Sequence, residues 1–298
     1  MRRSSFLKIG GLAAGSLLLG SRQVMAAIDG DPWTIKMLTP EVGVFTEKGG
    51  TILFYVSPDG VLVVDAEFPE QAGHLITEMK KKTAKPFALL INTHHHADHS
   101  SGNIAFKDLV PHVLAHENSL KNQIRSAESQ KSTDKQLYPD QTFKTTHQVN
   151  VGTESVRLHY FGPAHTDGDA LIHLEHSNIV HMGDLINNRR YPYIDRTAGA
   201  SISNWVSVLD KTPGTFDKNT TYVFGHASPG FDVYGKTEDI NKMKDYFEKL
   251  IVFTNQEIKA GKSKEEFLKN TAIPGVTEWV GDGIERSLQA AWEEFAMA

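Results

Sequence analysis

The 298-residue sequence contains no cysteine. Cysteine nucleophiles, thiolate metal ligands and disulfide bonds are therefore excluded. A chain of this length can bury a large core without disulfides, and its 40% apolar and 22% charged residues are typical of a folded globular protein. Any catalysis or metal binding must use other side chains.

The N-terminal region lacks an apolar run long enough to span a membrane. Its apolar stretch, residues 9–20, has 12 residues, which are too few to cross a bilayer. Two adjacent arginines precede this stretch, and residues 24–26 form a plausible cleavage site before Ala27, a pattern typical of an export signal comprising residues 1–26. The letters RRSSFLK resemble a twin-arginine motif with one additional spacer, although an ordinary signal with paired arginines remains the alternative.

Positive charge is not in excess either. The formal net charge of the whole chain is −5. Cleavage after residue 26 would remove four basic residues and no acidic one, so the mature chain would have a net charge of −9. Such an acidic chain without a basic stripe is a poor nucleic-acid binder. We expect an exported, periplasmic protein that acts on a small molecule and has no membrane span in its mature chain. The sequence does not give its oligomeric state.

Short runs rich in β-branched and aromatic residues predict the strands, and apolar residues at helical spacing predict the helices. Turn residues at 49–50 and 58–60 separate the first strands into an antiparallel meander. Strands are expected at 33–38, 43–46, 51–56, 60–65, 86–93, 112–116, 156–162, 169–175, 177–184 and 221–226. Helices are expected at 68–83, on both sides of 112–116, and from Thr237 onward, where an amphipathic helix ends at Gly261.

This order of elements predicts one domain, residues 27–298, with a helical extension from about 237 to 298. Two β-sheets covered by helices, formed from two similar halves, are the layered architecture that fits it. Residues 128–142 are polar and aperiodic and are expected to form an exposed loop. The C-terminal helices could cover the core or form a dimer contact, and we favour core packing.

Residues 93–103, THHHADHSSGN, place four of the 14 histidines within six positions. In an extended segment alternate side chains share a face, so His94 and His96 would project together while His95 points away. Asp98 and His99 lie on the loop beyond, where the chain can turn to present both. Imidazole and carboxylate donors together suit zinc, with iron and manganese as alternatives. A histidine-rich surface loop that binds no metal is the simpler alternative.

Three later donors favour the metal site. His165, Asp184 and His226 each follow an apolar strand and lie near a glycine, where the backbone can approach closely. A single histidine or aspartate at a strand end is usually a solvated turn residue, but three of them add to a dense cluster. The remaining histidines lie within ordinary helix and strand patterns and are expected to be structural. They are His74, His112, His116, His147, His159, His173, His176 and His181.

HHHADH, followed by His165, Asp184 and His226 in this order, resembles the metallo-β-lactamase superfamily over roughly residues 35–229. The resemblance implies an α/β fold, a four-layer αββα sandwich with a dinuclear metal site at the edge of its sheets. It implies that one zinc is held by His94, His96 and His165, the other by Asp98, His99 and His226, and that Asp184 bridges both. Asp65 matches an aspartate that supports the metal site from outside, and His95 occupies a variable position and is not an expected ligand.

The implied activity is metal-dependent hydrolysis. Two metal ions sharing a water would lower its pKa from about 15.7 toward about 7 and so produce a metal-bound hydroxide that attacks a carbonyl. Asp98 is placed to orient this water or accept its proton, which makes it the expected catalytic residue. The sequence contains no G-x-S-x-G motif that would supply a serine nucleophile.

The sequence indicates the substrate less precisely than it indicates the metal site. Many true metallo-β-lactamases carry cysteine or serine where this chain has Asp184, and aspartate is more usual in lactonases, phosphodiesterases and glutathione thioesterases of the superfamily. Export favours β-lactams and counts against glutathione thioesters. We therefore expect a dinuclear zinc hydrolase of cyclic amides, esters or thioesters, with β-lactams and lactones as the leading classes.

Residues 186–201 are the expected wall of the substrate site. Arg189 and Arg190 could pair with a substrate carboxylate, and Tyr191 and Tyr193 could pack on its apolar part. A surface loop with structural tyrosines is the alternative.

Other functions remain open on the same residues. A phosphodiesterase would share the metal site, although the acidic chain disfavours polymeric substrates. A mononuclear iron redox enzyme or a non-catalytic metal-binding protein needs fewer donors than the seven present.

Overall fold

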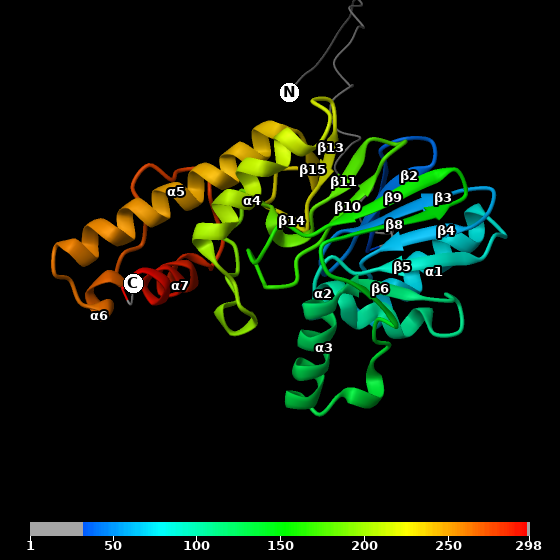
Figure 1. Ribbon diagram of the computed structural model, residues 1–298, viewed down its shortest axis with the longest axis horizontal. Coiled ribbons are helices and arrows are strands. Elements are labelled where there is room, and N and C mark those ends of the chain that lie inside the picture. Colours follow the sequence, from blue (N-terminus) through cyan, green and yellow to red (C-terminus); the bar gives the residue numbers. More distant parts are fainter. Residues whose placement is uncertain (1–31, 297–298) are drawn as a thin grey trace, which may run out of the picture. The chain divides into compact units, whose positions relative to one another are not determined.

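The computed structural model describes residues 32–296 (Figure 1). The predicted export signal, residues 1–26, lies outside the described residues. Within them, no helix combines the length and the apolar character that a membrane span requires.

The first sheet has seven strands in the order β1-β2-β3-β4-β5-β6-β7. They are β1 (Thr34–Met37), β2 (Val42–Thr46), β3 (Ile52–Val56), β4 (Val61–Val64), β5 (Phe87–Ile91), β6 (Val113–His116) and β7 (Gln141–Phe143). The first four form the predicted antiparallel meander, and the last four are parallel. β7 begins within the segment 128–142 that was predicted as a loop.

The second sheet has six strands in the order β15-β13-β11-β10-β9-β8. They are β8 (Thr146–Val151), β9 (Glu154–His159), β10 (Leu171–Leu174), β11 (Ile179–His181), β13 (Thr221–Val223) and β15 (Tyr234–Gly235). A separate two-stranded sheet pairs β12 (Asn187–Asn188) with β14 (His226–Ala227). Both large sheets contain parallel and antiparallel neighbours.

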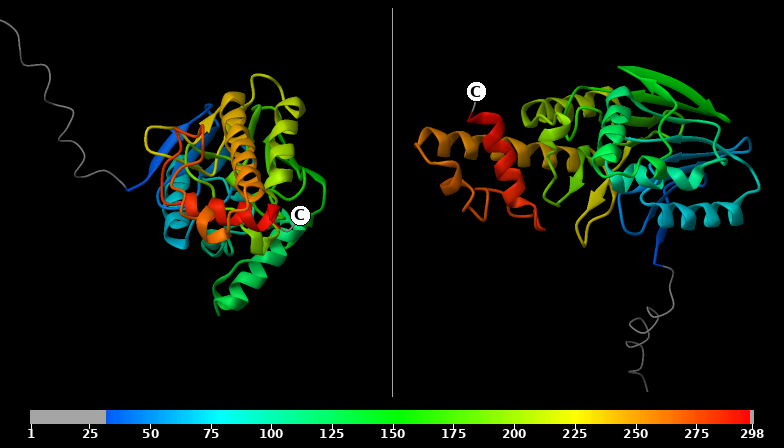
Figure 2. Two further views of the ribbon diagram at one scale, coloured as in Figure 1. Left: turned by 90° about the vertical axis from the view of Figure 1, so that its left-hand side faces the viewer. Right: turned by 90° about the horizontal axis from the view of Figure 1, so that it is seen from below.

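The helices of the described residues are α1 (Pro69–Lys82), α2 (Ala97–Ser100), α3 (Glu117–Ser129), α4 (Ile202–Thr215), α5 (Thr237–Lys259), α6 (Lys264–Phe267) and α7 (Ile284–Phe295). Of these, α1 covers the outer face of the first sheet, and α4 and α5 cover the outer face of the second (Figure 2). α1 starts with Pro69 in its first turn and ends with three lysines in its last turn, as proline geometry and the helix dipole favour.

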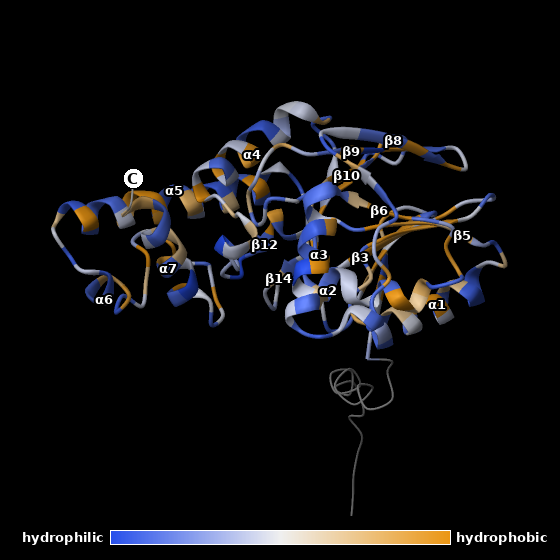
Figure 3. Cartoon of the chain, turned by 60° about the horizontal axis from the view of Figure 1, so that its bottom comes forward, coloured by the Kyte–Doolittle hydropathy of each residue, from blue (hydrophilic) through white to orange (hydrophobic). Residues whose placement is uncertain are grey.

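The residues of β4 divide between two cores because side chains alternate along a strand. Leu62 and Val64 pack between the sheets. Val61 and Val63 pack on the opposite face, under α1, where they meet Leu75. The inner strands β2 to β5 of the first sheet are thus buried on both faces, and Figure 3 shows apolar residues along the strands and on α1.

The second sheet is built in the same way. Ile172 of β10 faces the core between the sheets, and the preceding Leu171 faces α4 and α5. There the rings of Trp205 and Phe247 lie 4.4 Å apart. The order helix, sheet, sheet, helix confirms the predicted four-layer αββα sandwich.

The C-terminal residues join the core under α4 and α5. Phe267, Ile273 and Leu288 are buried in it, and Trp279 is buried against Tyr246 of α5. The structure therefore agrees with core packing of the C-terminal helices.

Candidate metal centre

The seven predicted donors lie together at one edge of the two sheets. The loop after β5 and the short helix α2 carry the donors of the HHHADH segment, and the others follow β9, β11 and β13. Parallel β11 and β13 leave the second sheet side by side, so Asp184 and His226 emerge close together. We call His94, His96 and His165 the histidine group, and Asp98, His99 and His226 the mixed group.

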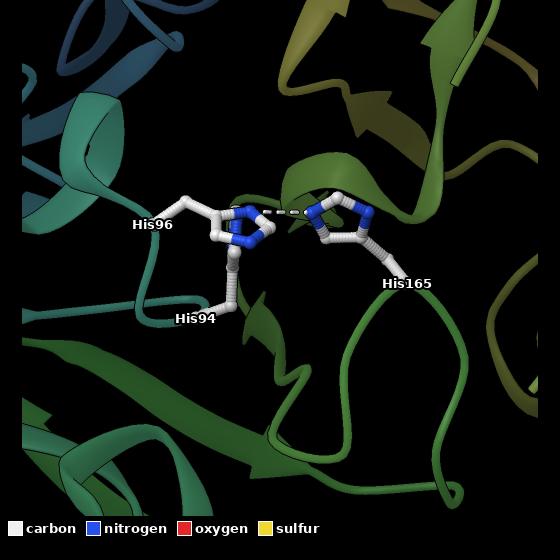
Figure 4. Close-up of side chains that lie close together, drawn as sticks. All are labelled: His94, His96 and His165. Carbon is white, nitrogen blue, oxygen red and sulfur yellow. Dashed lines mark hydrogen bonds between the residues drawn. The ribbon is translucent and has the colours of Figure 1, made fainter. Parts of the chain in front are cut away.

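In the histidine group three ring nitrogens converge (Figure 4). Nδ1 of His96 lies 3.1 Å from Nε2 of His94 and 2.8 Å from Nε2 of His165. His94 and His165 are fully buried, and His96 is partly exposed. One cation could therefore bind all three imidazoles.

In the mixed group, Nε2 of His226 lies 3.1 Å from Oδ2 of Asp98, and Nε2 of His99 lies 3.8 Å from the same oxygen. Asp184 reaches both groups. Its carboxylate lies 3.0 Å from Nε2 of His99, 3.4 Å from Nε2 of His226 and 3.6 Å from Nε2 of His165. This is the position that a bridging ligand requires.

Two rings are oriented by Asp65, directly or through a hydroxyl. Nδ1 of His99 donates to Oδ2 of Asp65 at 2.8 Å. Nδ1 of His94 lies 3.1 Å from the hydroxyl of Thr93, which donates to the same carboxylate at 2.7 Å. With Nδ1 of both rings engaged in this way, each Nε2 keeps its lone pair for the site, as metal-binding histidines require.

Two other rings are oriented by the segment 193–195. Nδ1 of His165 donates to the carbonyl of Tyr193 at 2.7 Å, and Nε2 of His96 donates to Oδ2 of Asp195 at 2.9 Å. His165 therefore offers Nε2 to the histidine group, and His96 offers Nδ1. Four of the five imidazoles are thus held with a free nitrogen facing inward.

Two buried atoms make the clearest case that a cation fits. Nε2 of His99 and Oδ1 of Asp184 have no hydrogen-bond partner among residues 32–296, although they lie 3.0 Å apart. Buried polar atoms are rarely left unsatisfied, and a shared cation would satisfy both. The donor set therefore fits a metal centre.

The two groups differ in their proton affinity. Burial, the largest cause, and neighbouring imidazoles together lower the pKa of His94 and lower that of His165 to about 3. Burial opposes the charge of His99 and His226 too, but Asp184 and neighbouring carboxylates raise their pKa, to about 9 for His226. Without metal the mixed group therefore holds protons that a cation must displace.

Two glycines allow this close approach. A Cβ atom on Gly225 would lie 1.9 Å from Oδ1 of Asp184, and one on Gly50 would lie 2.2 Å from Cε1 of His99. Any larger residue at either position would push a predicted ligand out of place.

The donors open into a cavity of about 320 Å³ lined by Asp98, Asp184 and His226. Three predicted substrate-contact residues, Arg190, Tyr191 and Tyr193, lie in its wall. Their contacts with a substrate stay a prediction.

Arg189 does not line this cavity, which corrects its predicted role. Its backbone is left-handed (φ 59°), and its side chain is buried on the other side of the loop. There it lies 3.3 Å from Asp239 and 3.4 Å from Glu278, and it packs on the ring of Phe231. Arg189 is therefore a structural residue.

Two residues of the site were not predicted from the sequence. Asp195 orients His96, and Arg286 of α7 lines the cavity with its guanidinium carbon 5.7 Å from the ring centre of Tyr193. Neither belongs to a recognisable motif. His95 lies outside both donor groups, as expected. It is nevertheless buried, with Nε2 3.7 Å from Asp195.

A four-layer sandwich with histidine and aspartate donors at the edge of its sheets defines the metallo-β-lactamase fold. The model of the metallo-beta-lactamase superfamily matches residues 46–254, and the chain belongs to this superfamily. It is 24% identical over 206 residues to a metallo-beta-lactamase type 2 from Bacillus sp. (strain 170), covering 66% of this chain and 77% of that protein.

A solved structure shows the same fold. The metallo-beta-lactamase from Pontibacter korlensis superposes with a TM-score of 0.61 at 20% identity, covering 72% of this chain and 99% of that one. The family match ends at residue 254, so α6 and α7, and with them Arg286, lie beyond it.

Proposed function

We propose that this protein is a dinuclear zinc hydrolase of small cyclic amides or esters, in which water adds to the carbonyl carbon and the ring C–N or C–O bond breaks. The observation that carries the proposal is Asp184, whose carboxylate lies within 3.6 Å of both donor groups. When bound, zinc polarises a carbonyl and lowers the pKa of water toward about 7. Iron or manganese would suit the same donors.

Asp98 is the residue we assign to proton transfer. Its carboxylate lines the cavity and is 31% exposed, so water can reach it. Burial raises the pKa of Asp98, but His99 and His226 outweigh this and hold it below its usual value. An ionised Asp98 can accept a hydrogen bond from the attacking water and orient it.

Arg190 and Arg286 favour an anionic substrate. Both line the cavity, and neither forms an ion pair with a carboxylate in the described part of the chain. A guanidinium binds a carboxylate through paired hydrogen bonds. β-Lactams carry a carboxylate beside the reactive amide, which supports them over neutral lactones. Action in the periplasm would fit such a substrate and stays a prediction from the N-terminal sequence.

The test is the initial rate of hydrolysis of a chromogenic cephalosporin by the zinc-loaded protein. We expect turnover that Asp98→Ala lowers by at least about 100-fold, the range for loss of a general base. Asp140→Ala is the matched control, because Asp140 pairs with His112 in an exposed position. Turnover of lactones alone would reassign the substrate. No turnover of cephalosporins, lactones, thioesters or phosphodiesters by protein that holds two zinc ions would refute the hydrolase proposal.

A further inference from the structure

His96 is oriented differently from the other two rings of the histidine group. It presents Nδ1 to the group, whereas His94 and His165 present Nε2. Its Nε2 faces outward and meets Oδ2 of Asp195 at 2.9 Å. The ring is also the most exposed of the three, with 17% of its side chain accessible at the cavity wall.

The carboxylate of Asp195 cannot turn away from His96. Its other oxygen, Oδ1, accepts hydrogen bonds from the hydroxyl and the backbone N–H of Thr197, at 2.6 and 3.1 Å, and from the N–H of Ala198 at 3.1 Å. The side chain is 7% exposed. Oδ2 is therefore fixed at the position where it accepts the proton of His96.

The backbone around Asp195 holds a second ring. The carbonyl of Tyr193 accepts from Nδ1 of His165, and the N–H of Asp195 donates to the carbonyl of His165 at 3.2 Å. Arg196 anchors the same segment to α7 through Glu294 at 2.7 Å. Residues 193–196 thus connect the C-terminal helix to two predicted ligands of one metal.

We propose that Asp195 is a positioning residue for the metal of the histidine group, an inference that rests on the proposed metal-dependent function. It holds His96 with the proton on Nε2, so that Nδ1 offers its lone pair to the metal. Carboxylates in this position typically change metal affinity by about 10- to 100-fold. Asp195 does not line the cavity at the donors and acts through His96.

Asp195→Asn tests the proposal with little change in shape. The amide oxygen can still accept from Thr197 and Ala198, which places the amide NH₂ against Nε2 of His96. That NH₂ donates, so the ring proton must move to Nδ1, where it blocks the metal. We expect zinc affinity at the histidine group to fall about 10- to 100-fold. At a buffered free zinc concentration where the wild type keeps two ions per chain, the variant should keep one.

The matched control is Asp140→Asn, the same change in the exposed His112–Asp140 pair, whose atoms lie 2.7 Å apart. It should keep two zinc ions. Nitrogen-15 NMR of the imidazoles gives a readout that a general loss of packing would not produce. We expect His96 to carry its proton on Nε2 in the metal-free wild type and on Nδ1 in Asp195→Asn.

A measurement on the wild type remains decisive if Asp195→Asn does not fold. In protein loaded with ¹¹³Cd, we expect scalar coupling from the metal to Nδ1 of His96 and to Nε2 of His94. Coupling through Nε2 of His96 would overturn the proposal, as would an unchanged zinc affinity in Asp195→Asn. A third zinc bound by His95, His96 and Asp195, whose donor atoms also lie within 4.8 Å of one another, would overturn it too. If the cephalosporin assay fails while these results hold, the proposed substrate is wrong and the role of Asp195 stands.

Discussion

Glu294 of α7 offers the sharpest test of how the C-terminal helix supports the site. Its carboxylate accepts from the N–H groups of Ile202 and Ser203, at 2.8 and 2.9 Å, and from Arg196 at 2.7 Å. The N–H groups of Ile202 and Ser203 lie in the first turn of α4, where no carbonyl of the helix itself can accept from them. Glu294 thus caps α4 and holds the segment that contains Asp195.

The cost of Glu294→Gln follows from these contacts. The substitution removes a negative charge from a helix N-terminus, worth about 0.3–1 kcal/mol. It also turns one acceptor into a donor that faces another donor, which costs about 1–3 kcal/mol when the group is buried. The side chain is only 12% exposed, so solvent offsets little of this. We expect a loss of about 3 kcal/mol in the free energy of unfolding, or roughly 6–12 °C in melting temperature.

Urea unfolding followed by circular dichroism measures this loss. The control is Glu293→Gln on the same helix, because Glu293 pairs with Lys264 at 3.0 Å with both side chains about one-third exposed. Such a pair contributes about 0–1 kcal/mol. If the two variants lose equal stability, Glu294 does not cap α4 in the way proposed.

Two further predictions concern charge. Burial raises the pKa of Asp169 to about 7, above its value in the unfolded chain. The resulting contribution to stability is therefore complete below about pH 4 and is lost as the pH rises through 7. Asp169→Asn should therefore gain stability relative to the wild type between pH 4 and 8, by up to about 4 kcal/mol in denaturant titrations, and a constant difference would contradict this. Arg286→Ala should raise KM for a carboxylate-bearing cephalosporin about 10-fold with little change in kcat. An equal rise in KM for an uncharged lactone would show that the charge is not recognised.

The seven donors could be predicted because each is recognisable from its immediate sequence neighbours, as a polar residue at or just after the end of an apolar strand. The meander was equally visible, since glycines and a proline separate strands that are buried on both faces. Strand β8 was missed because its exposed positions are polar, including Gln148 and Asn150. α4 was missed although Ile202, Trp205 and Leu209 have helical spacing, because its last turn contains Pro213, a poor helix former.

Apart from Asp65, the supporting residues could not be predicted, because they depend on contacts between distant segments. Asp195 meets His96 from 99 positions away, and Glu294 meets Arg196 from 98. The two neighbouring arginines have different roles because of one backbone conformation. The left-handed backbone of Arg189 turns its side chain inward, and Arg190 is left at the cavity. Composition and periodicity contain no record of such a turn.

The placement of the donors also has a consequence for folding. His96 follows a strand of the first sheet and His165 a strand of the second, 69 positions later, yet their ring nitrogens lie 2.8 Å apart. A complete set of donors therefore exists only after both sheets have formed and stacked. A cation bound by the full set thus cannot assist the formation of one sheet in the absence of the other. Once held, at a free concentration 100 times its Kd, it would add about 2.7 kcal/mol against separation of the two sheets. Metal occupancy would then report whether the whole sandwich has assembled.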